Sequence, residues 1–170
     1  KLGPDAWLEQ IRSLRAALGI PIIASLNGTR RGPWVEFARL AEEAGAHAIE
    51  LNLYALPSNP DLDAAAVEHR LLDVVGAVRA QTKLPLSVKL SPFFSAPVAF
   101  VRALEKAGAN GVVLFNRFYQ ADIDVESLEL VRVLHLSDPS ELLLRLRWLA
   151  LVSPTTKLSL ACSGGAHAGL

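Results

Sequence analysis

The residues best suited to chemistry in this chain stand where short apolar runs end. Asn27, Asn52 and Asn116 each close such a run, and Lys89 lies near the end of another. An asparagine side chain offers both donors and an acceptor, and a lysine adds a positive charge. A further run leads to Ser163-Gly164-Gly165, where glycine lets backbone N–H groups approach a phosphate. We expect these groups to surround one ligand.

The elements that must position these side chains alternate between helix and strand. Asp138, Pro139 and Glu141 have the spacing of a helix start, with an N-cap, a proline in the first turn and a capping glutamate. Helical spacing of apolar residues or start signals predict helices near 7–18, 33–41, 67–78, 100–104 and 138–148. Short apolar runs predict buried strands at 21–26, 47–53, 86–90, 111–116 and 157–161.

An internal repeat indicates how these units are arranged. Ala44-Gly45-Ala46 and Ala107-Gly108-Ala109 both stand between a predicted helix and a buried strand. Repeated junctions of this kind predict a parallel α/β sheet, and the spacing of about 34 residues per unit is typical of a TIM (β/α)8 barrel. We therefore predict a single domain over residues 1–170 with about five of eight units, truncated at both ends. A doubly wound sheet is disfavoured because no GxGxxG turn follows the first strand.

The composition narrows the function classes. Hydrophobic residues make up 51% of the chain, which fits strands buried on both faces. The 17 basic and 17 acidic residues cancel, so we expect no nucleic-acid partner and no membrane, only a small-molecule substrate. The single cysteine favours a reducing, cytoplasmic location. The four histidines lack metal-ligand spacing, so no metal is predicted.

Four motifs, in order, resemble the dihydroorotate dehydrogenase family of FMN-dependent barrels. Glu50-Leu51-Asn52-Leu53 is similar to the family's E-L-N-L-S-C-P-N, and the segment 88–94 is similar to its V-K-L-P-P-Y-F. Asn116 falls where the sixth family strand offers an asparagine, and Ser163-Gly164-Gly165 is similar to the T-G-G phosphate turn. The resemblance covers nearly the whole chain, from the family's third strand to its seventh.

The resemblance implies a flavin site and a role for each motif. Lys89 would lie beside the flavin and stabilise the negative charge of the reduced ring. Asn52 and Asn116 would hydrogen-bond the flavin or the substrate. Ser163, Gly164 and Gly165 would bind the FMN phosphate. The implied activity is oxidation or reduction of a carbon–carbon bond in a pyrimidine-like ring, as in pyrimidine biosynthesis.

One departure from the family pattern bears on this activity. Ala55 stands where the family carries its catalytic cysteine or serine, and alanine cannot move a proton. The preceding Tyr54 is a candidate proton donor. We therefore expect a paralogue with an altered substrate or with impaired dihydroorotate oxidation.

Two other readings fit the same residues. A phosphate-binding isomerase or lyase without redox chemistry would keep Gly164-Gly165 but would bring paired carboxylates to the rim. A non-catalytic, degenerate barrel would leave open sheet edges that a second chain, as in a homodimer, would cover. The neighbouring Arg30 and Arg31 would either receive an anion or remain a solvated pair of loop residues.

Overall fold

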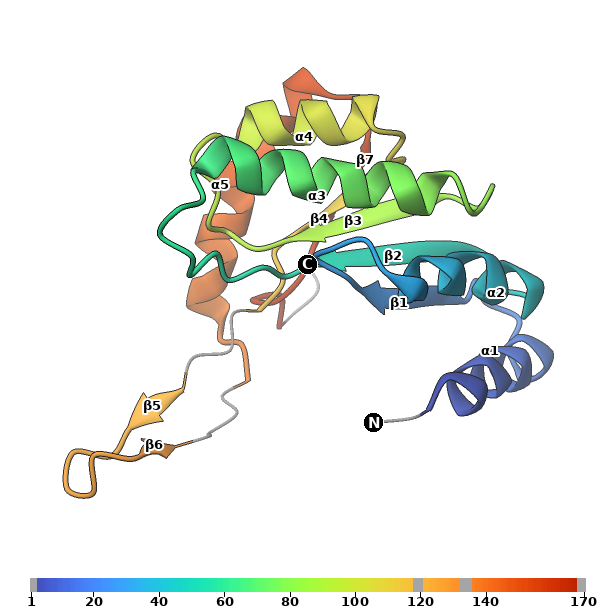
Figure 1. Cartoon of the computed structure of the whole chain (residues 1–170), viewed down its shortest axis with the longest axis horizontal. Helices are drawn as coiled ribbons and strands as arrows, with labels where there is room; N and C mark the ends of the chain where they lie inside the picture. The colour runs from blue at the N-terminus through green and yellow to red at the C-terminus, as the bar shows by residue number, and fades with distance from the viewer. Residues whose placement is uncertain (1–2, 118–120, 132–135, 168–170) are drawn as a thin grey trace.

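The computed structural model describes residues 3–117, 121–131 and 136–167. Within them, five parallel strands form one sheet in the order β1-β2-β3-β4-β7 (Figure 1). The strands of this sheet are β1 (Ile23–Asn27), β2 (Ala48–Leu53), β3 (Leu86–Leu90), β4 (Gly111–Leu114) and β7 (Ser159–Cys162). All five predicted strands are therefore present, with ends within two residues of the predicted bounds.

Helix α1 precedes β1, and the other α-helices lie between successive strands of the sheet along the chain (Figure 1). The α-helices are α1 (Pro4–Ala17), α2 (Phe37–Glu43), α3 (Ala64–Arg79), α4 (Pro97–Lys106) and α5 (Leu142–Val152). Short 3-10 turns flank two of them: η1 (Pro33–Glu36) precedes α2, η2 (Pro139–Glu141) precedes α5, and η3 (Ser153–Thr155) follows α5. The alternating order confirms the predicted parallel α/β architecture.

The two faces of the sheet differ in chemistry. On the face covered by helices, Ile49, Leu51 and Val88 are fully buried and join one apolar cluster with helix residues such as Val74 and Val78. Side chains on the other face alternate with these, because successive residues of a strand point to opposite sides. That face carries polar side chains and is partly exposed: Ser25, Asn27, Glu50, Asn52, Ser87 and Lys89.

The repeated helix-to-strand junction is a real structural repeat. Gly45 and Gly108 both have positive φ, at 96° and 99°, which favours glycine. After each glycine, the chain reaches back to the neighbouring strand through one side chain. His47 Nδ1 accepts a hydrogen bond from Ile22 N at 2.8 Å, and Asn110 Oδ1 accepts one from Leu86 N at 2.9 Å. The His47 side chain therefore has a structural role, because it accepts a hydrogen bond from the backbone just before β1.

Three details of the sequence prediction are wrong. The apolar spacing in this segment places Ile11 and Leu14 on one buried face of α1, but Leu8 and Ile11 are the buried residues and Leu14 is 37% exposed. Asp138 caps Ser140 N at 2.8 Å, but the segment begins as a 3-10 turn, and the Glu141 carboxylate bonds Arg145 rather than serving as a capping group.

The excursion between β4 and α5 also holds a feature that the sequence did not predict. A two-stranded hairpin, β5 (Asp122–Ile123) and β6 (Leu130–Val131), projects from the body (Figure 1). Its strands are only two residues long, too short for an alternating pattern to be recognised in the sequence.

Candidate functional site

A ladder of three asparagines crosses the carboxyl ends of the strands. Asn27 and Asn52 are paired in register on β1 and β2, and Lys89 is the next residue of the same row on β3. Asn52 Nδ2 donates to Asn27 Oδ1 at 2.7 Å, and Asn116 Nδ2 donates to Asn52 Oδ1 at 3.0 Å. Asn116 follows β4, and its backbone N donates to Leu90 O at 2.6 Å. The structure thus brings together all three asparagines selected from the sequence.

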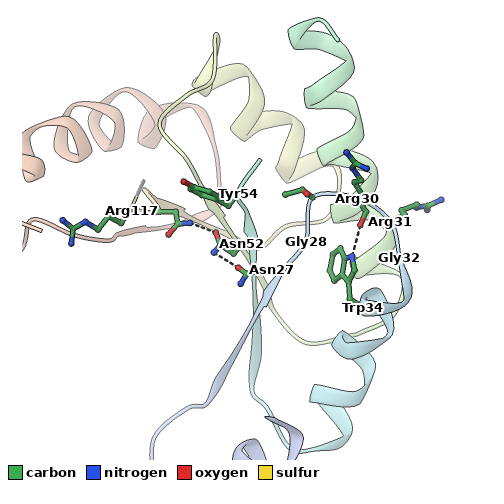
Figure 2. Close-up of a pocket in the computed structure, with 11 residues that line it drawn as sticks. Asn27, Gly28, Arg30, Arg31, Gly32, Trp34, Asn52, Tyr54 and Arg117 are labelled. Carbon is green, nitrogen blue, oxygen red and sulfur yellow. Dashed lines mark hydrogen bonds between the residues drawn. The ribbon is translucent and has the colours of Figure 1, made fainter. Parts of the chain in front are cut away.

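A cavity of about 730 Å³ lies beside this ladder. Figure 2 shows the ladder on one side and the loop after β1, with Trp34, on the other. The Trp34 ring packs directly on Gly28, since a Cβ at that position would lie 1.9 Å from the ring, and its Nε1 donates to Arg30 O at 2.9 Å. The cavity is lined by Asn27, Gly28, Thr29, Arg30, Arg31, Gly32, Trp34, Asn52, Tyr54, Asn116 and Arg117.

The charge of this cavity wall is entirely positive. Its lining residues include Arg30, Arg31 and Arg117 but no aspartate or glutamate. Arg117 lies 4.0 Å from Glu141 Oε1, while no ion pair is formed by Arg30 or Arg31 with any residue in the described ranges. A planar, hydrogen-bonding ligand with an anionic group matches this combination of amides and guanidinium groups.

Lys89 forms an ion pair with Glu50. Its Nζ lies 3.6 Å from Glu50 Oε1, and both side chains are about one-fifth exposed, at 21% and 20%. Ser25 Oγ donates to the same carboxylate oxygen at 3.1 Å. The period of two along β2 places Glu50 on the face of Asn52, while its pairing with Lys89 depends on the register of β2 with β3.

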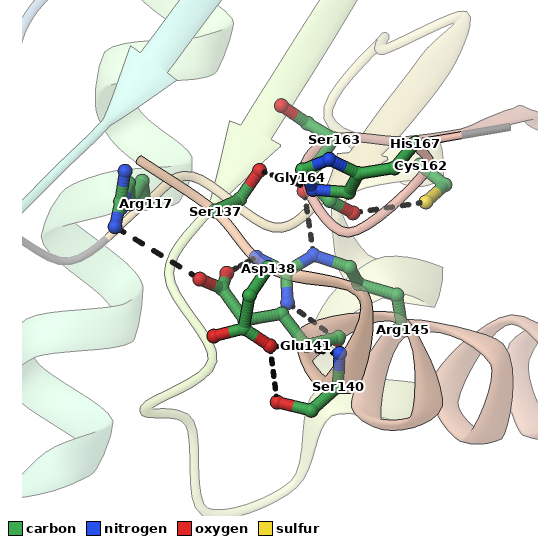
Figure 3. A network of polar contacts seen from close by, with 10 residues as sticks. All are labelled: Arg117, Ser137, Asp138, Ser140, Glu141, Arg145, Cys162, Ser163, Gly164 and His167. Carbon is green, nitrogen blue, oxygen red and sulfur yellow. Dashed lines mark hydrogen bonds and ion pairs between the residues drawn. The ribbon is translucent and has the colours of Figure 1, made fainter. Parts of the chain in front are cut away.

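The glycine turn after β7 is held by a buried arginine. Gly164 and Gly165 have φ values of 85° and 81°. Arg145, which is 5% exposed, donates through Nε to Ser163 O at 2.6 Å and through Nη1 to Glu141 O at 2.6 Å (Figure 3). Its Nη2 also bonds the Glu141 carboxylate at 2.8 Å, so one side chain ties the turn to the start of α5.

Close packing accounts for the second glycine of the turn. A Cβ on Gly165 would lie 2.5 Å from the backbone N of Leu142. The turn therefore rests on the first residues of α5, and only a residue without a side chain permits this approach. Nothing in the sequence signalled Arg145, because in the apolar segment 142–152 it reads as an interruption rather than as a ligand of the turn.

Tyr54 and Ala55 face different cavities. Tyr54 lines the 730 Å³ cavity together with Asn52 and Asn116. Ala55 lines a second cavity of about 260 Å³ between the loops after β2 and β3, where Ser91 and Phe94 are among its neighbours. Of the two candidate positions 54 and 55, it is Tyr54 whose side chain shares a cavity with the asparagine ladder.

Neither a metal cluster nor a membrane-spanning helix is found in the described part of the chain. No group of three or more histidine, cysteine, aspartate or glutamate side chains in residues 3–117, 121–131 and 136–167 is arranged to hold a metal ion. Among the described helices, none has the length and apolar character needed to cross a membrane.

Comparison with solved structures defines the fold class. Phosphonopyruvate hydrolase aligns with a TM-score of 0.59 at 17% identity, over 96% of this chain and 60% of that one. The dihydrodipicolinate synthase of Bacteroides thetaiotaomicron aligns with a TM-score of 0.56 at 15% identity, over 95% of this chain and 46% of that one. These enzymes are TIM barrels, so the sheet and its helices form part of such a barrel, as predicted.

Comparison with curated sequences defines the family, although no protein-family model matches the chain. The catalytic subunit of dihydroorotate dehydrogenase B (NAD(+)) from Endomicrobium trichonymphae is 31% identical over 132 residues, 75% of this chain and 42% of that protein. The subunit of the same name from Geobacillus kaustophilus is 35% identical over 131 residues, 71% of this chain and 37% of that protein. The chain belongs to the dihydroorotate dehydrogenase family.

Within this family the chain is divergent. A third relative, the subunit of that name from Geobacillus sp. (strain WCH70), matches 96% of the chain at 28% identity and 54% of its own length. The chain therefore spans about two-fifths to half the length of these family members. The motif resemblance noted in the sequence is confirmed at the level of the family.

Proposed function

We propose that this chain forms the ligand site of an FMN-dependent oxidoreductase that acts on a carbon–carbon bond of a pyrimidine-like ring. The observation that carries the proposal is the row of Asn27, Asn52 and Lys89, extended by Asn116, along one rim of the sheet. Amide and ammonium groups in one row match the nitrogen and oxygen edge of a flavin or of a pyrimidine.

The residues present fit the cofactor by their donor chemistry. When bound, FMN supplies hydride transfer to or from the substrate carbon. Lys89 supplies positive charge at the rim, which stabilises the negative charge that a reduced flavin carries. Asn52 and Asn116 orient the flavin or the substrate, and the backbone N–H groups of the turn from Ser163 through Gly164 to Gly165 hold the phosphate.

The proton step is assigned to Tyr54. A general acid must lie within reach of the reacting atom, and Tyr54 shares the cavity of the asparagine ladder whereas Ala55 lines another one. A phenol in place of the family's cysteine or serine favours a substrate other than dihydroorotate. The arginines of the cavity wall favour a substrate with an anionic group.

The first test is the absorption spectrum of the protein purified without added cofactor. A band at about 450 nm, typical of oxidised protein-bound flavin, supports the proposal. A colourless protein that takes up no added FMN contradicts it and would make Lys89 and the asparagines structural residues.

The proton step is tested with dihydroorotate as the probe. We expect slow flavin reduction by the unmodified protein, slower reduction by Tyr54→Phe, which removes the proposed proton donor, and no increase in rate in Ala55→Cys, whose side chain lines the other cavity. Rapid dihydroorotate oxidation by the unmodified protein would contradict an altered substrate. The phosphate-binding isomerase or lyase is a weaker alternative, since the lining residues of the large cavity include no carboxylate pair.

A further inference from the structure

One acidic side chain lies directly beneath the proposed ligand row. Glu50 precedes Asn52 by two residues on β2 and therefore points to the same face. Its Oε1 lies 3.6 Å from Lys89 Nζ and accepts a hydrogen bond from Ser25 Oγ at 3.1 Å. Three strands thus contribute to one polar cluster.

This cluster has no evident role in stabilising the fold. Taking a carboxylate and an ammonium out of water costs free energy that their mutual attraction only partly offsets. Glu50 and Lys89 are four-fifths buried, at 20% and 21% exposure, but they lie on the polar face of the sheet and not in the apolar cluster. The pair lies on the same face of the sheet as the row of Asn27 and Asn52, with Glu50 two residues before Asn52 on β2, so its position points to the ligand row rather than to the core.

We propose that Glu50 is a positioning residue for Lys89: it holds the ammonium at the rim and offsets part of its charge, and so sets how strongly the site favours a reduced flavin. Ser25 fixes the carboxylate through its hydroxyl. This inference rests on the proposed flavin site and adds to it the residue that adjusts Lys89.

The expected effect follows from charge. A glutamine at position 50 keeps the shape and can still accept a hydrogen bond from Ser25, but it removes one negative charge next to Lys89. The uncompensated ammonium then stabilises an anionic reduced flavin more strongly. We expect the reduced cofactor to gain about tenfold in affinity over the oxidised one, which corresponds to a rise of about 30 mV for a two-electron couple.

The experiment compares Glu50→Gln with the unmodified protein and with Glu105→Gln. Glu105 is a matched control, because its carboxylate bonds Thr156 Oγ1 at 2.6 Å, near the amino end of β7. The dissociation constant of oxidised FMN is measured by fluorescence quenching, the midpoint potential by dye equilibration, and folding by thermal unfolding of the apoprotein. Ser25→Ala should shift the potential in the same direction by a smaller amount.

The outcomes separate the two proposals. A raised potential in Glu50→Gln, with no shift in Glu105→Gln, supports the positioning role. An unchanged or lowered potential in a folded, FMN-binding Glu50→Gln protein overturns it while leaving the flavin site in place. If the unmodified protein binds no FMN, the proposed function itself fails, and the role of Glu50 fails with it.

Discussion

The two ends of the sheet use similar polar side chains for different purposes. At the amino end, polar groups from neighbouring βα units bond one another and complete the junctions. At the carboxyl end, the asparagine ladder borders a cavity of about 730 Å³, and Lys89 continues the row of Asn27 and Asn52 on the next strand. In TIM barrels the carboxyl end carries the active site and the opposite end carries stability, and the polar groups at the two ends of this five-stranded sheet differ in the same sense.

The amino end contains the same acid-to-threonine contact twice. The Glu42 carboxylate accepts from Thr82 Oγ1 at 2.5 Å and from Lys83 N at 3.1 Å. Each threonine hydroxyl in turn accepts from a backbone N two residues later, Leu84 N in the first junction. The second copy consists of Glu105, Thr156, Lys157 and Leu158.

The carboxyl end is less complete within its own chain. Asn116 and Asn27 form the two ends of the ladder, and each has amide capacity beyond the single ladder bond. Arg30 and Arg31 line the cavity without an ion pair to the described residues. At the amino end, the polar side chains hydrogen-bond one another and support the fold. At the carboxyl end, they keep donors and acceptors with which a ligand can be bound.

The largest expected effect breaks the ladder at its centre. Asn52→Leu removes the partner of both Asn27 and Asn116 and places an apolar group in the ligand row. We expect the FMN dissociation constant to rise about 100-fold, or about 2.7 kcal/mol, with a smaller change in the free energy of unfolding. Isothermal titration with FMN and urea unfolding measure the two quantities.

The matched control is the same substitution at the other end of the sheet. Asn110 Oδ1 accepts from Leu86 N and from Arg79 Nη1, so Asn110→Leu should lower stability and leave FMN affinity unchanged. Equal losses of FMN affinity in both variants would contradict the division of labour between the two ends.

The next largest effect is expected at the glycine turn after β7, which supports the fold as well as the proposed phosphate site. Gly165→Ala places a Cβ against the backbone of Leu142 at a φ of 81°. We expect a loss of about 2 kcal/mol in the free energy of unfolding, because alanine is strained at a positive φ and its Cβ would clash with the backbone of Leu142. Denaturant titration measures it.

Gly76→Ala provides the control for this change. Gly76 lies within α3 and has open space around its Cβ position, so alanine there should stabilise by about 0.5–1 kcal/mol. Equal stability of Gly165→Ala and the unmodified protein would show that the turn does not need its close contact with α5.

The sequence predicted the fold better than the site. Strands such as 86–90 are short apolar runs between glycine, proline and charged residues, and this local pattern suffices to locate them. The repeated Ala-Gly-Ala junction identified the parallel order. Asn52, Lys89 and Asn116 were found because each stands at a strand end, where topology brings them to one rim.

What the sequence did not reveal depends on contacts between distant segments. Trp34 packs on Gly28 and Arg145 holds Ser163 through side-chain geometry that no spacing encodes. The ion pair of Lys89 with Glu50 requires the register of β2 with β3, which becomes known only in the folded sheet. Local sequence patterns therefore predict the helices and strands, whereas the side-chain contacts between them depend on the register of the folded sheet.

The smallest effect tests the amino end through its response to pH. The Thr82 hydroxyl, which bonds the Glu42 carboxylate, lowers the pKa of Glu42 from its ordinary value. A lowered folded-state pKa means that Glu42 stabilises the fold above its unfolded pKa of about 4.3 and that this contribution is lost as the pH falls through the folded pKa. Glu42→Gln should therefore cost about 1 kcal/mol at pH 7 and progressively less in acid.

Urea unfolding at a series of pH values from neutral to acidic measures this difference. The neighbouring Glu43→Gln is the matched control, because Glu43 pairs with Arg39 on the exposed side of α2 and should change stability little at any pH. FMN affinity should be unchanged in both variants at neutral pH. If Glu42→Gln weakens FMN binding as much as Asn52→Leu does, the amino end also shapes the ligand site, and the functional contrast between the two ends does not hold.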